Sequence, residues 1–394
     1  MKIITRAIWI LSLVSLLTDV SSEMLYPVMP IYLKHIGFSV LLIGLLEGLA
    51  EAVAGFSKGY FGKLSDHIGS RVPFIRLGYF LSALSKPMMA AFTYPGWIFS
   101  ARTMDRLGKG LRTGARDAQL SDQTTPEHKG KVFGFHRSMD TIGAVIGPLV
   151  ALIYLYYYPG QYRIMFVLAF SPGLLGVAIT FLLREKKKRP IEDKKPNLFS
   201  FLKYWKESPA AYRSLVSGLL CFALINSSDV FLLLLLKAKG ISDVHLIMVY
   251  VFYNLCYAAF AYPAGIIADR IGLKTTLIIG LLFFATVYGG IAFVNTLPLF
   301  LLLFALYGLY AAMTEGISKA LISNVSKRSD IATAIGTYAA FSSIMALLSS
   351  SIAGLVWFSF GPMTLFVCSA TGAFLVILYF VIIKLTPGSI IDAG

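Results

Sequence analysis

Long apolar segments separated by short polar connections run along almost the whole chain. A helix that crosses the hydrocarbon core of a bilayer needs about 20 mostly apolar residues, and twelve segments approach or exceed that length. They span residues 7–33, 38–61, 73–93, 95–116, 131–156, 162–183, 211–236, 243–268, 273–294, 298–323, 332–357 and 361–385. The pattern predicts an all-α integral membrane protein with twelve transmembrane helices.

The fourth segment is unusual because residues 100–122 carry eight charged side chains. At about 100° per residue, seven of them fall on one helical face roughly 140° wide. These seven are Arg102, Asp105, Arg106, Lys109, Arg112, Arg116 and Asp117. A loop has no reason to sort its charges in this way, so we predict a membrane helix whose glycines, Gly108, Gly110 and Gly114, permit close packing. Its charged face must line a water-filled cavity or pair with acids, since each cation at mid-bilayer costs at least about 2.5 kcal/mol.

The two halves of the sequence repeat. GKLSDHIGSR, which begins at Gly62, matches GIIADRIGLK, which begins at Gly265, at an offset of 203 residues. Residues 122–134 match residues 324–336 at an offset of 202. Two anchors with nearly equal offsets indicate internal duplication, a common feature of secondary transporters.

A basic segment, residues 184–209, separates the halves. Its first part is charged and interrupted by proline, whereas residues 198–205 are amphipathic and predict a helix on the cytoplasmic membrane surface. We therefore expect a six-helix half over 1–183, a linker over 184–209 and a second six-helix half over 210–394, with the halves around a central cavity.

The net charge of +15 is concentrated in alternate connections, whereas the chain as a whole is 57% hydrophobic and only 14% charged. The basic connections lie at residues 58–76, 129–131, 184–206, 270–274 and 327–328. This positive-inside pattern predicts that both termini are cytoplasmic, in a cell (inner) membrane, and it disfavours nucleic acid as a partner.

Acidic residues within the predicted spans are candidates for coupling chemistry, since polar groups inside membranes are functional by default. Asp19 and Glu23 are one turn apart on the first span, and Glu315 and Lys319 are one turn apart on the tenth. The candidate residues for substrate binding and proton coupling are Asp19, Glu23, Arg102, Asp105, Arg106, Lys109, Arg112, Asp140, Asp229, Glu315 and Lys319.

The duplicated loop resembles the cytoplasmic motif of the major facilitator superfamily, although His67 and Ser70 depart from the usual pattern. The resemblance covers essentially the whole chain and implies alternating access of two six-helix halves. An acid such as Asp66 would pair with a cation on a neighbouring helix, Arg116 for example, or face a helix N-terminus from the other half. The gating residues that this implies are Gly62, Asp66, Gly69, Arg71, Arg116, Asp117, Gly265, Asp269, Arg270, Gly272 and Lys274.

The fifth span resembles the antiporter signature of the same family at Gly143, Gly147 and Pro148, without the glycines that usually follow the proline. The glycines would permit close helix packing and the proline would bend the helix. Arg102 lies roughly where the family has a fourth-span arginine associated with proton coupling.

These observations exclude the common enzyme classes, because the chain contains no phosphate loop, metal-ligand spacing or nucleophile motif. We expect no cofactor and no metal. The predicted function is secondary active transport by a monomer that exchanges H⁺ and exports small amphipathic compounds. The alternative is a carrier of anionic metabolites or chelates that binds them on the basic face of the fourth span, since clustered cations suit carboxylates and phosphates.

Overall fold

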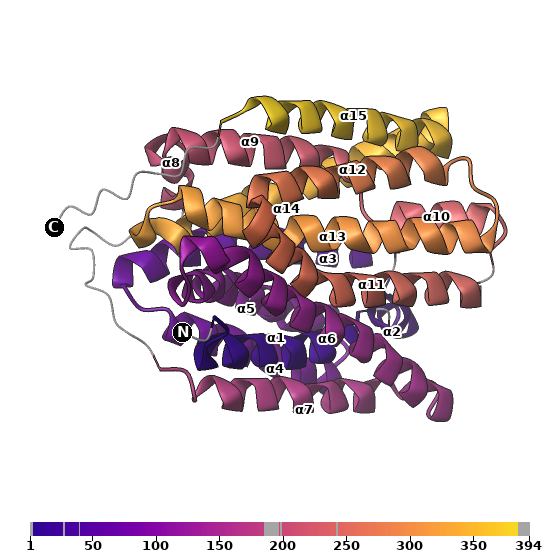
Figure 1. Ribbon diagram of the computed structural model, residues 1–394. Coiled ribbons are helices and arrows are strands. Elements are labelled where there is room, and N and C mark those ends of the chain that lie inside the picture. Colours follow the sequence, from indigo (N-terminus) through magenta and orange to yellow (C-terminus); the bar gives the residue numbers. More distant parts are fainter. Residues whose placement is uncertain are drawn as a thin grey trace. The chain divides into compact units, whose positions relative to one another are not determined.

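The computed structural model describes residues 3–26, 28–38, 40–184, 197, 199–241 and 243–384, which form fifteen α-helices and two short 3₁₀ turns (Figure 1). The helices of the first half of the chain are α1 (Arg6–Glu23), α2 (Met29–His35), α3 (Val40–Ile68), α4 (Val72–Ala91), α5 (Pro95–Asp122), α6 (Lys129–Tyr157) and α7 (Tyr162–Thr180). Helix α8 (Ser200–Glu207) follows, and then come α9 (Ala210–Ile225), α10 (Val230–Ala238), α11 (Asp243–Ile271), α12 (Leu273–Ile291), α13 (Leu297–Val325), α14 (Ile331–Phe360) and α15 (Pro362–Ile382). The 3₁₀ turns, η1 (Pro126–His128) and η2 (Arg328–Asp330), precede α6 and α14.

The chain divides into two compact units. The first contains Met1–Gln123, Met139–Glu207 and Arg328–Ala340, and the second contains Thr124–Ser138, Ser208–Lys327 and Phe341–Gly394. The first turns of α6 are therefore grouped with the second unit, and the first turns of α14 with the first unit. The division into six-helix halves over 1–183 and 210–394 stays a prediction.

Equivalent helices pack in the same way inside each unit. In the first unit α5 packs against α3 and α4, and α4 packs against α7. In the second unit α13 packs against α11 and α12, and α12 packs against α15. The duplicated sequence thus forms a duplicated arrangement of helices.

The first and seventh predicted spans, 7–33 and 211–236, each contain a break between two helices. Helix α1 ends at Glu23 and α2 begins at Met29, while α9 ends at Ile225 and α10 begins at Val230. In the first case Pro27 has no N–H to donate to the carbonyl of Glu23, four residues earlier. In the second, residues 226–229 read Asn-Ser-Ser-Asp, whose side chains compete for backbone hydrogen bonds. The two breaks lie at equivalent positions of the repeat, as in other transporters with discontinuous helices.

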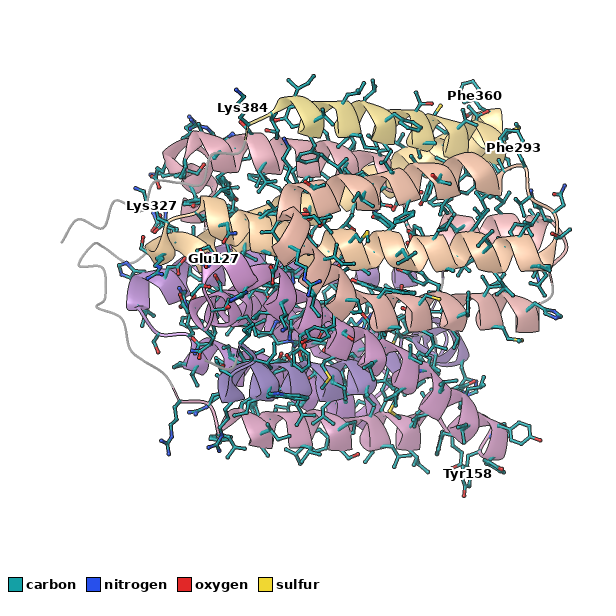
Figure 2. All side chains as sticks on the ribbon, in the orientation of Figure 1. Glu127, Tyr158, Phe293, Lys327, Phe360 and Lys384 are labelled. Atoms are coloured by element: carbon teal, nitrogen blue, oxygen red, sulfur yellow. The ribbon has the colours of Figure 1, made fainter. Side chains whose placement is uncertain are left out.

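In the described part of the chain, seven helices are long and apolar enough to cross a membrane by length and composition, namely α6, α7 and α11–α15. The side chains along these helices are largely apolar (Figure 2). In the second unit, Glu127, Lys327 and Lys384 lie at one end of the bundle, and Phe293 and Phe360 lie at the other.

The amphipathic part of the linker forms most of α8, and its position on the membrane surface stays a prediction. Phe201 and Tyr204 are buried, whereas Leu202 is exposed. Residues 185–196 and 198, which include most of the charged part of the linker, lie outside the described residues.

Candidate functional site

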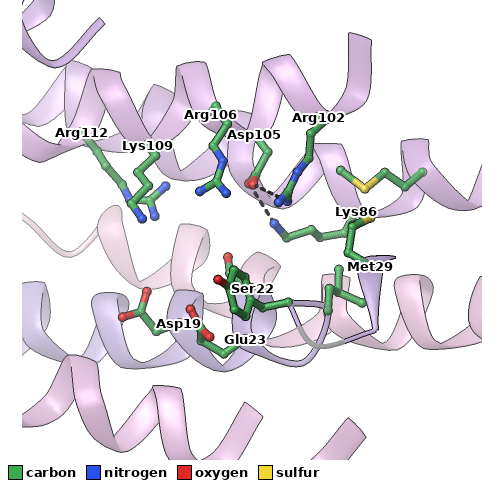
Figure 3. Close-up of a pocket in the computed structure, with 13 residues that line it drawn as sticks. Asp19, Ser22, Glu23, Met29, Lys86, Arg102, Asp105, Arg106, Lys109 and Arg112 are labelled. Carbon is green, nitrogen blue, oxygen red and sulfur yellow. Dashed lines mark hydrogen bonds and ion pairs between the residues drawn. The ribbon is translucent and has the colours of Figure 1, made fainter. Parts of the chain in front are cut away.

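A polar cavity lies inside the first unit, between α1, the start of α2, α4 and α5 (Figure 3). It contains about 540 Å³ of empty space, including the space at its open mouth. The charged residues that line it are Asp19, Glu23, Lys86, Arg102, Asp105, Arg106, Lys109 and Arg112. Seven of these eight were predicted from the sequence as substrate or coupling residues, and the fold brings them into one cavity.

Helix α5 supplies most of the cations that line the cavity. Its glycines allow it to lie close to α3 and α4. A Cβ atom at Gly108 would lie 2.5 Å from the carbonyl oxygen of Gly78 on α4. At Gly114 it would lie 3.1 Å from the Cα of Gly62 on α3. The predicted role of the glycines in close packing is confirmed, and the charged face is left to line the cavity.

Asp105 is held between two cations. The Lys86 Nζ donates to Oδ1 of Asp105 at 2.8 Å, and Nη1 of Arg102 lies 3.7 Å from Oδ2 (Figure 3). All three side chains are nearly buried. Lys86 was missed in the sequence analysis, although a lysine in the middle of the apolar segment 73–93 is itself a signal of an intramembrane partner.

Arg112 is fixed by two contacts with α4. Its Nη1 donates to the Ser82 Oγ at 2.5 Å, and its guanidinium carbon lies 4.6 Å from the centre of the Tyr79 ring. A guanidinium group stacked on an aromatic face loses little hydration and keeps its donors oriented. This cation is therefore positioned before any ligand arrives.

Asp19 and Glu23 form the opposite wall of the cavity, on α1 (Figure 3). Both lie where α6 approaches closely: a Cβ atom at Gly143 would lie 3.0 Å from the Cβ of Asp19, and one at Gly147 would lie 2.9 Å from the Cβ of Glu23. Gly143 and Gly147 therefore allow α6 to lie close to the part of α1 that carries these two carboxylates. With five cations against three carboxylates, the side chains that line the cavity carry a formal charge of +2.

Arg116, Asp117 and Asp140 belong to a separate buried network in the first unit. The Arg116 Nε donates to Asp117 at 2.9 Å, and its Nη1 donates to the Ser15 Oγ at 3.0 Å. The Ser15 hydroxyl in turn donates to Asp140. The suggested ion pair between Arg116 and Asp66 is therefore wrong, because Arg116 is directed toward α1.

The predicted loop motifs bring two carboxylates to helix N-termini. Within the first unit, Oδ2 of Asp66 accepts the Thr333 N–H at 2.6 Å and its hydroxyl at 2.7 Å. Within the second unit, Asp269 accepts the N–H groups of Gly130 at 2.8 Å and Lys131 at 2.9 Å. The two offsets of the repeat relate Asp66 to Asp269, at 203 residues, and Lys131 to Thr333, at 202 residues, so the N–H contacts of Thr333 and Lys131 are equivalent. Each carboxylate satisfies otherwise unpaired donors and faces the positive end of a helix dipole.

The other residues of the motifs have distinct local roles. Gly69 and Gly272 have φ values of +69° and +99°, a conformation that favours glycine. Arg71 forms an ion pair with Asp66. Lys274 donates to the carbonyl of Ile383 at 2.6 Å and so caps the end of α15. Arg270 is exposed.

Gly62 and Gly265 permit the approach of the two helix N-termini. A Cβ atom at Gly62 would collide with the carbonyl oxygen of Ala332, and one at Gly265 with that of Gly130. The first glycine of each motif is thus required by the contact that the acid makes.

The predicted acids of the second unit lie among tyrosines that the sequence analysis did not single out. The Tyr307 hydroxyl donates to Oδ1 of Asp229 at 2.6 Å, and the Asn226 amide donates to the Tyr310 hydroxyl at 3.0 Å. The rings of Tyr253 and Tyr307 are 5.0 Å apart. Their spacing along α11 and α13 is that of an ordinary packed face, so no sequence signal separated them from core residues.

Glu315 pairs with Arg137, whose Nη2 lies 3.0 Å from Oε2 of the carboxylate. The Arg137 guanidinium also contacts the hydroxyl and ring of Tyr257. Arg137 was not among the predicted site residues. Lys319 lies one turn after Glu315 on α13, as its spacing predicted.

Comparison with known proteins gives the family. The chain matches the model of the Major Facilitator Superfamily over residues 11–252 and 230–390. It is 31% identical over 364 residues to an uncharacterized MFS-type transporter of Methanocaldococcus jannaschii, covering 90% of this chain and 89% of that protein. A shorter match, 28% identical over 165 residues, covers 42% of this chain and 40% of the multidrug resistance protein MdtH of Photorhabdus laumondii.

Solved structures share the fold at low sequence identity. The human organic anion transporter MFSD10 superposes with a TM-score of 0.80 at 16% identity, over 95% of this chain and 99% of that one. The Escherichia coli fucose:proton symporter FucP superposes with a TM-score of 0.76 at 14% identity, over 96% and 98% of the two chains. These structures carry the twelve-helix, two-domain fold that was predicted here. The chain therefore belongs to the Major Facilitator Superfamily and is a membrane transporter, not an enzyme.

Proposed function

We propose that this transporter carries small organic anions by alternating access and binds them in the cavity between α1, α4 and α5. The observation that supports the proposal is the charge balance of that cavity, five cations against three carboxylates. An anion with one or two carboxylate or phosphate groups would bring the cavity close to neutrality. The sequence left open whether the acids neutralise the cations, and this balance favours the anionic alternative over export of cationic compounds.

In this proposal the charged residues that line the cavity have three different roles. Arg106, Lys109 and Arg112 contact the anion, because charge-assisted hydrogen bonds to carboxylate or phosphate are the strong ones. Lys86 and Arg102 are partly neutralised by Asp105. Asp19 and Glu23 take up the coupling proton, so that protonation raises the positive charge of the cavity and strengthens anion binding. The protein acts as a monomer in the inner membrane with both termini in the cytoplasm.

Export of amphipathic cations in exchange for protons is the second candidate. It is supported by the partial similarity to MdtH and by the acids and tyrosines of the second unit, Asp229 with Tyr307, and Glu315 with Arg137, which in turn contacts Tyr257. Aromatic faces next to carboxylates suit organic cations.

The test is ligand-driven proton movement in liposomes that contain the purified protein and a trapped pH-sensitive dye. The probes are p-aminohippurate, citrate and glucose 6-phosphate as anions, and tetraphenylphosphonium as the cation. We expect at least one anion to move protons, and Arg106→Gln to weaken its apparent affinity by about tenfold or more, the value of a lost charge-assisted bond. Arg163→Gln is the matched control, because Arg163 is exposed on α7, away from the cavity.

A different pattern of proton movement would support the cation exporter instead. Proton movement driven only by tetraphenylphosphonium, lost in Asp229→Asn and retained in Arg106→Gln, would replace the anion proposal with the cation exporter.

A further inference from the structure

Helix α8 has two opposite faces. At about 100° per residue, Phe201 and Tyr204 fall on one side, and Phe199, Leu202, Lys203 and Lys206 fall on the other. The first two are 1% and 3% exposed, whereas Phe199 is 57% and Leu202 is 38% exposed. Lys203 and Lys206 are also exposed. One face is therefore part of the core of the first unit, and the other combines apolar and basic side chains at its surface.

The segment is held along α3 at three points. The rings of Phe199 and Phe56 are 6.0 Å apart, and Glu207 lies 3.9 Å from Lys63. Between them the Phe201 ring lies directly over Gly59, where an added Cβ atom would be 2.5 Å from the ring. Positions 56, 59 and 63 share one face of α3, so α8 follows the last turns of that helix.

The same seam includes the first turns of α14. The Thr337 hydroxyl donates to the carbonyl of Phe201 at 3.4 Å. A Cβ atom at Gly336 would lie 3.4 Å from the Cα of Gly59, so the two helices touch through their backbones. Thr333, one turn before Thr337, holds Asp66. Helix α8 therefore covers the point where α3 and α14 are joined by the Asp66 contact.

The surface of α8 fits an anionic lipid leaflet. Ala210, the first residue of α9, follows Glu207 by three residues, so chain length alone keeps the end of α8 within about 10 Å of the start of α9, where the seventh predicted span begins. Apolar side chains beside lysines suit the boundary between acyl chains and headgroups. Each lysine close to an anionic surface adds favourable energy that salt screens.

We infer that the exposed face of α8, formed by Phe199, Leu202, Lys203 and Lys206, binds anionic lipid headgroups and thereby strengthens the Asp66–Thr333 contact between α3 and α14. Lipid holds α8 against the membrane surface, and the Phe201 and Thr337 contacts transmit this restraint to the start of α14. Lipid charge therefore regulates how readily this helix N-terminus opens.

The experiment measures backbone hydrogen exchange at the start of α14 in lipid nanodiscs. The full-length protein is compared in phosphatidylcholine alone and in phosphatidylcholine with a quarter of the lipid replaced by phosphatidylglycerol. We expect the anionic lipid to slow exchange at residues 331–335 by about fivefold, and high salt to remove the difference. The double variant Lys203→Gln/Lys206→Gln should lose the response, whereas Lys203→Arg/Lys206→Arg, which keeps the charge, should retain it.

Two results would overturn the inference. One is equal exchange of the native protein in the two lipids, and the other is an undiminished lipid response in the glutamine variant. Quenching by brominated phosphatidylglycerol of the tryptophan in Leu202→Trp, in a protein whose four native tryptophans are phenylalanine, tests lipid contact of the exposed face separately. Absence of that quenching would also contradict it. Because none of these readouts depends on a transported substrate, failure of the anion proposal would leave the result unchanged.

Discussion

At the scale of single residues, the feature that most constrains the first unit is a buried ion pair. Lys86 and Asp105 lie 2.8 Å apart on α4 and α5, and Arg102 adds a second cation. Removing one partner of such a pair leaves an uncompensated charge, whereas replacing both can be neutral. Removing one partner of this buried pair should therefore lower the free energy of unfolding much more than removing one partner of a surface ion pair.

Asp105→Asn should destabilise the protein by about 3–5 kcal/mol, because the Lys86 ammonium loses its closest carboxylate in a buried position. Lys86→Met/Asp105→Asn should recover most of that loss. The measurement is the free energy of unfolding in a double-mutant cycle, with detergent-solubilised protein.

The control for this cycle is Lys63→Met, which removes one partner of the more exposed pair with Glu207. Its effect should stay below about 1 kcal/mol. A double variant as unstable as Asp105→Asn alone would show that the loss does not come from the buried lysine.

At the scale of helices, glycine spacing decides how the charged α5 packs. Gly108 faces Gly78 and Ser82 of α4, and Gly110 faces Ser57 of α3. Without these contacts α5 would stand farther from its neighbours, and its cations would no longer converge on the cavity. Glycine carries a backbone entropy cost, so its use inside a helix requires such a packing reason.

Gly108→Ala should destabilise the unit by about 1–3 kcal/mol, because the new methyl would overlap backbone atoms of α4 that cannot move independently. Gly96→Ala, on the same helix, is the matched control, since no atom lies within 4 Å of its added Cβ. That change should be neutral or slightly stabilising, because alanine favours the helix. Thermal unfolding followed by size-exclusion chromatography compares the two, and equal losses would refute the packing argument.

At the scale of the whole molecule, each of the two units repeats one contact in which an acid binds the start of a helix. Asp66 binds Thr333 in the first unit, and Asp269 binds Gly130 and Lys131 in the second. An alternating-access transporter needs contacts that are stable in one state and broken in another. The loop acids are well suited to that role, because each accepts more than one hydrogen bond at the start of a helix.

Asp66→Asn and Asp269→Asn should each slow transport by about tenfold or more, since each loses charge-assisted bonds to backbone donors. The affinity for the substrate, an anion under our proposal, should remain unchanged, because neither acid lines the cavity. Transport rate and equilibrium binding of the same anion are measured on each variant. Glu127→Gln, which removes an exposed acid just before α6, should leave both unchanged.

Much of this protein follows from sequence alone. Hydrophobic periodicity, the duplicated loop motif and the one-sided charges of α5 predict the membrane class, the repeat and most of the cavity residues. These signals are local, because a helix face is defined by spacing within one segment. The breaks after Glu23 and Ile225 were also within reach, since Pro27 and the polar residues 226–229 stand in the sequence.

Tertiary structure alone decided which charges meet. Arg116 could have paired with Asp66 on sequence grounds, yet it joins Asp117 and Ser15, and Asp66 joins Arg71 and Thr333. Lys86 and Arg137 form ion pairs with acids on other helices, Lys86 with Asp105 and Arg137 with Glu315. Spacing along a helix specifies a face but not the neighbour that the face meets. Which neighbour a face contacts depends on how closely whole helices approach each other at their glycines. That approach is decided only when the helices pack together.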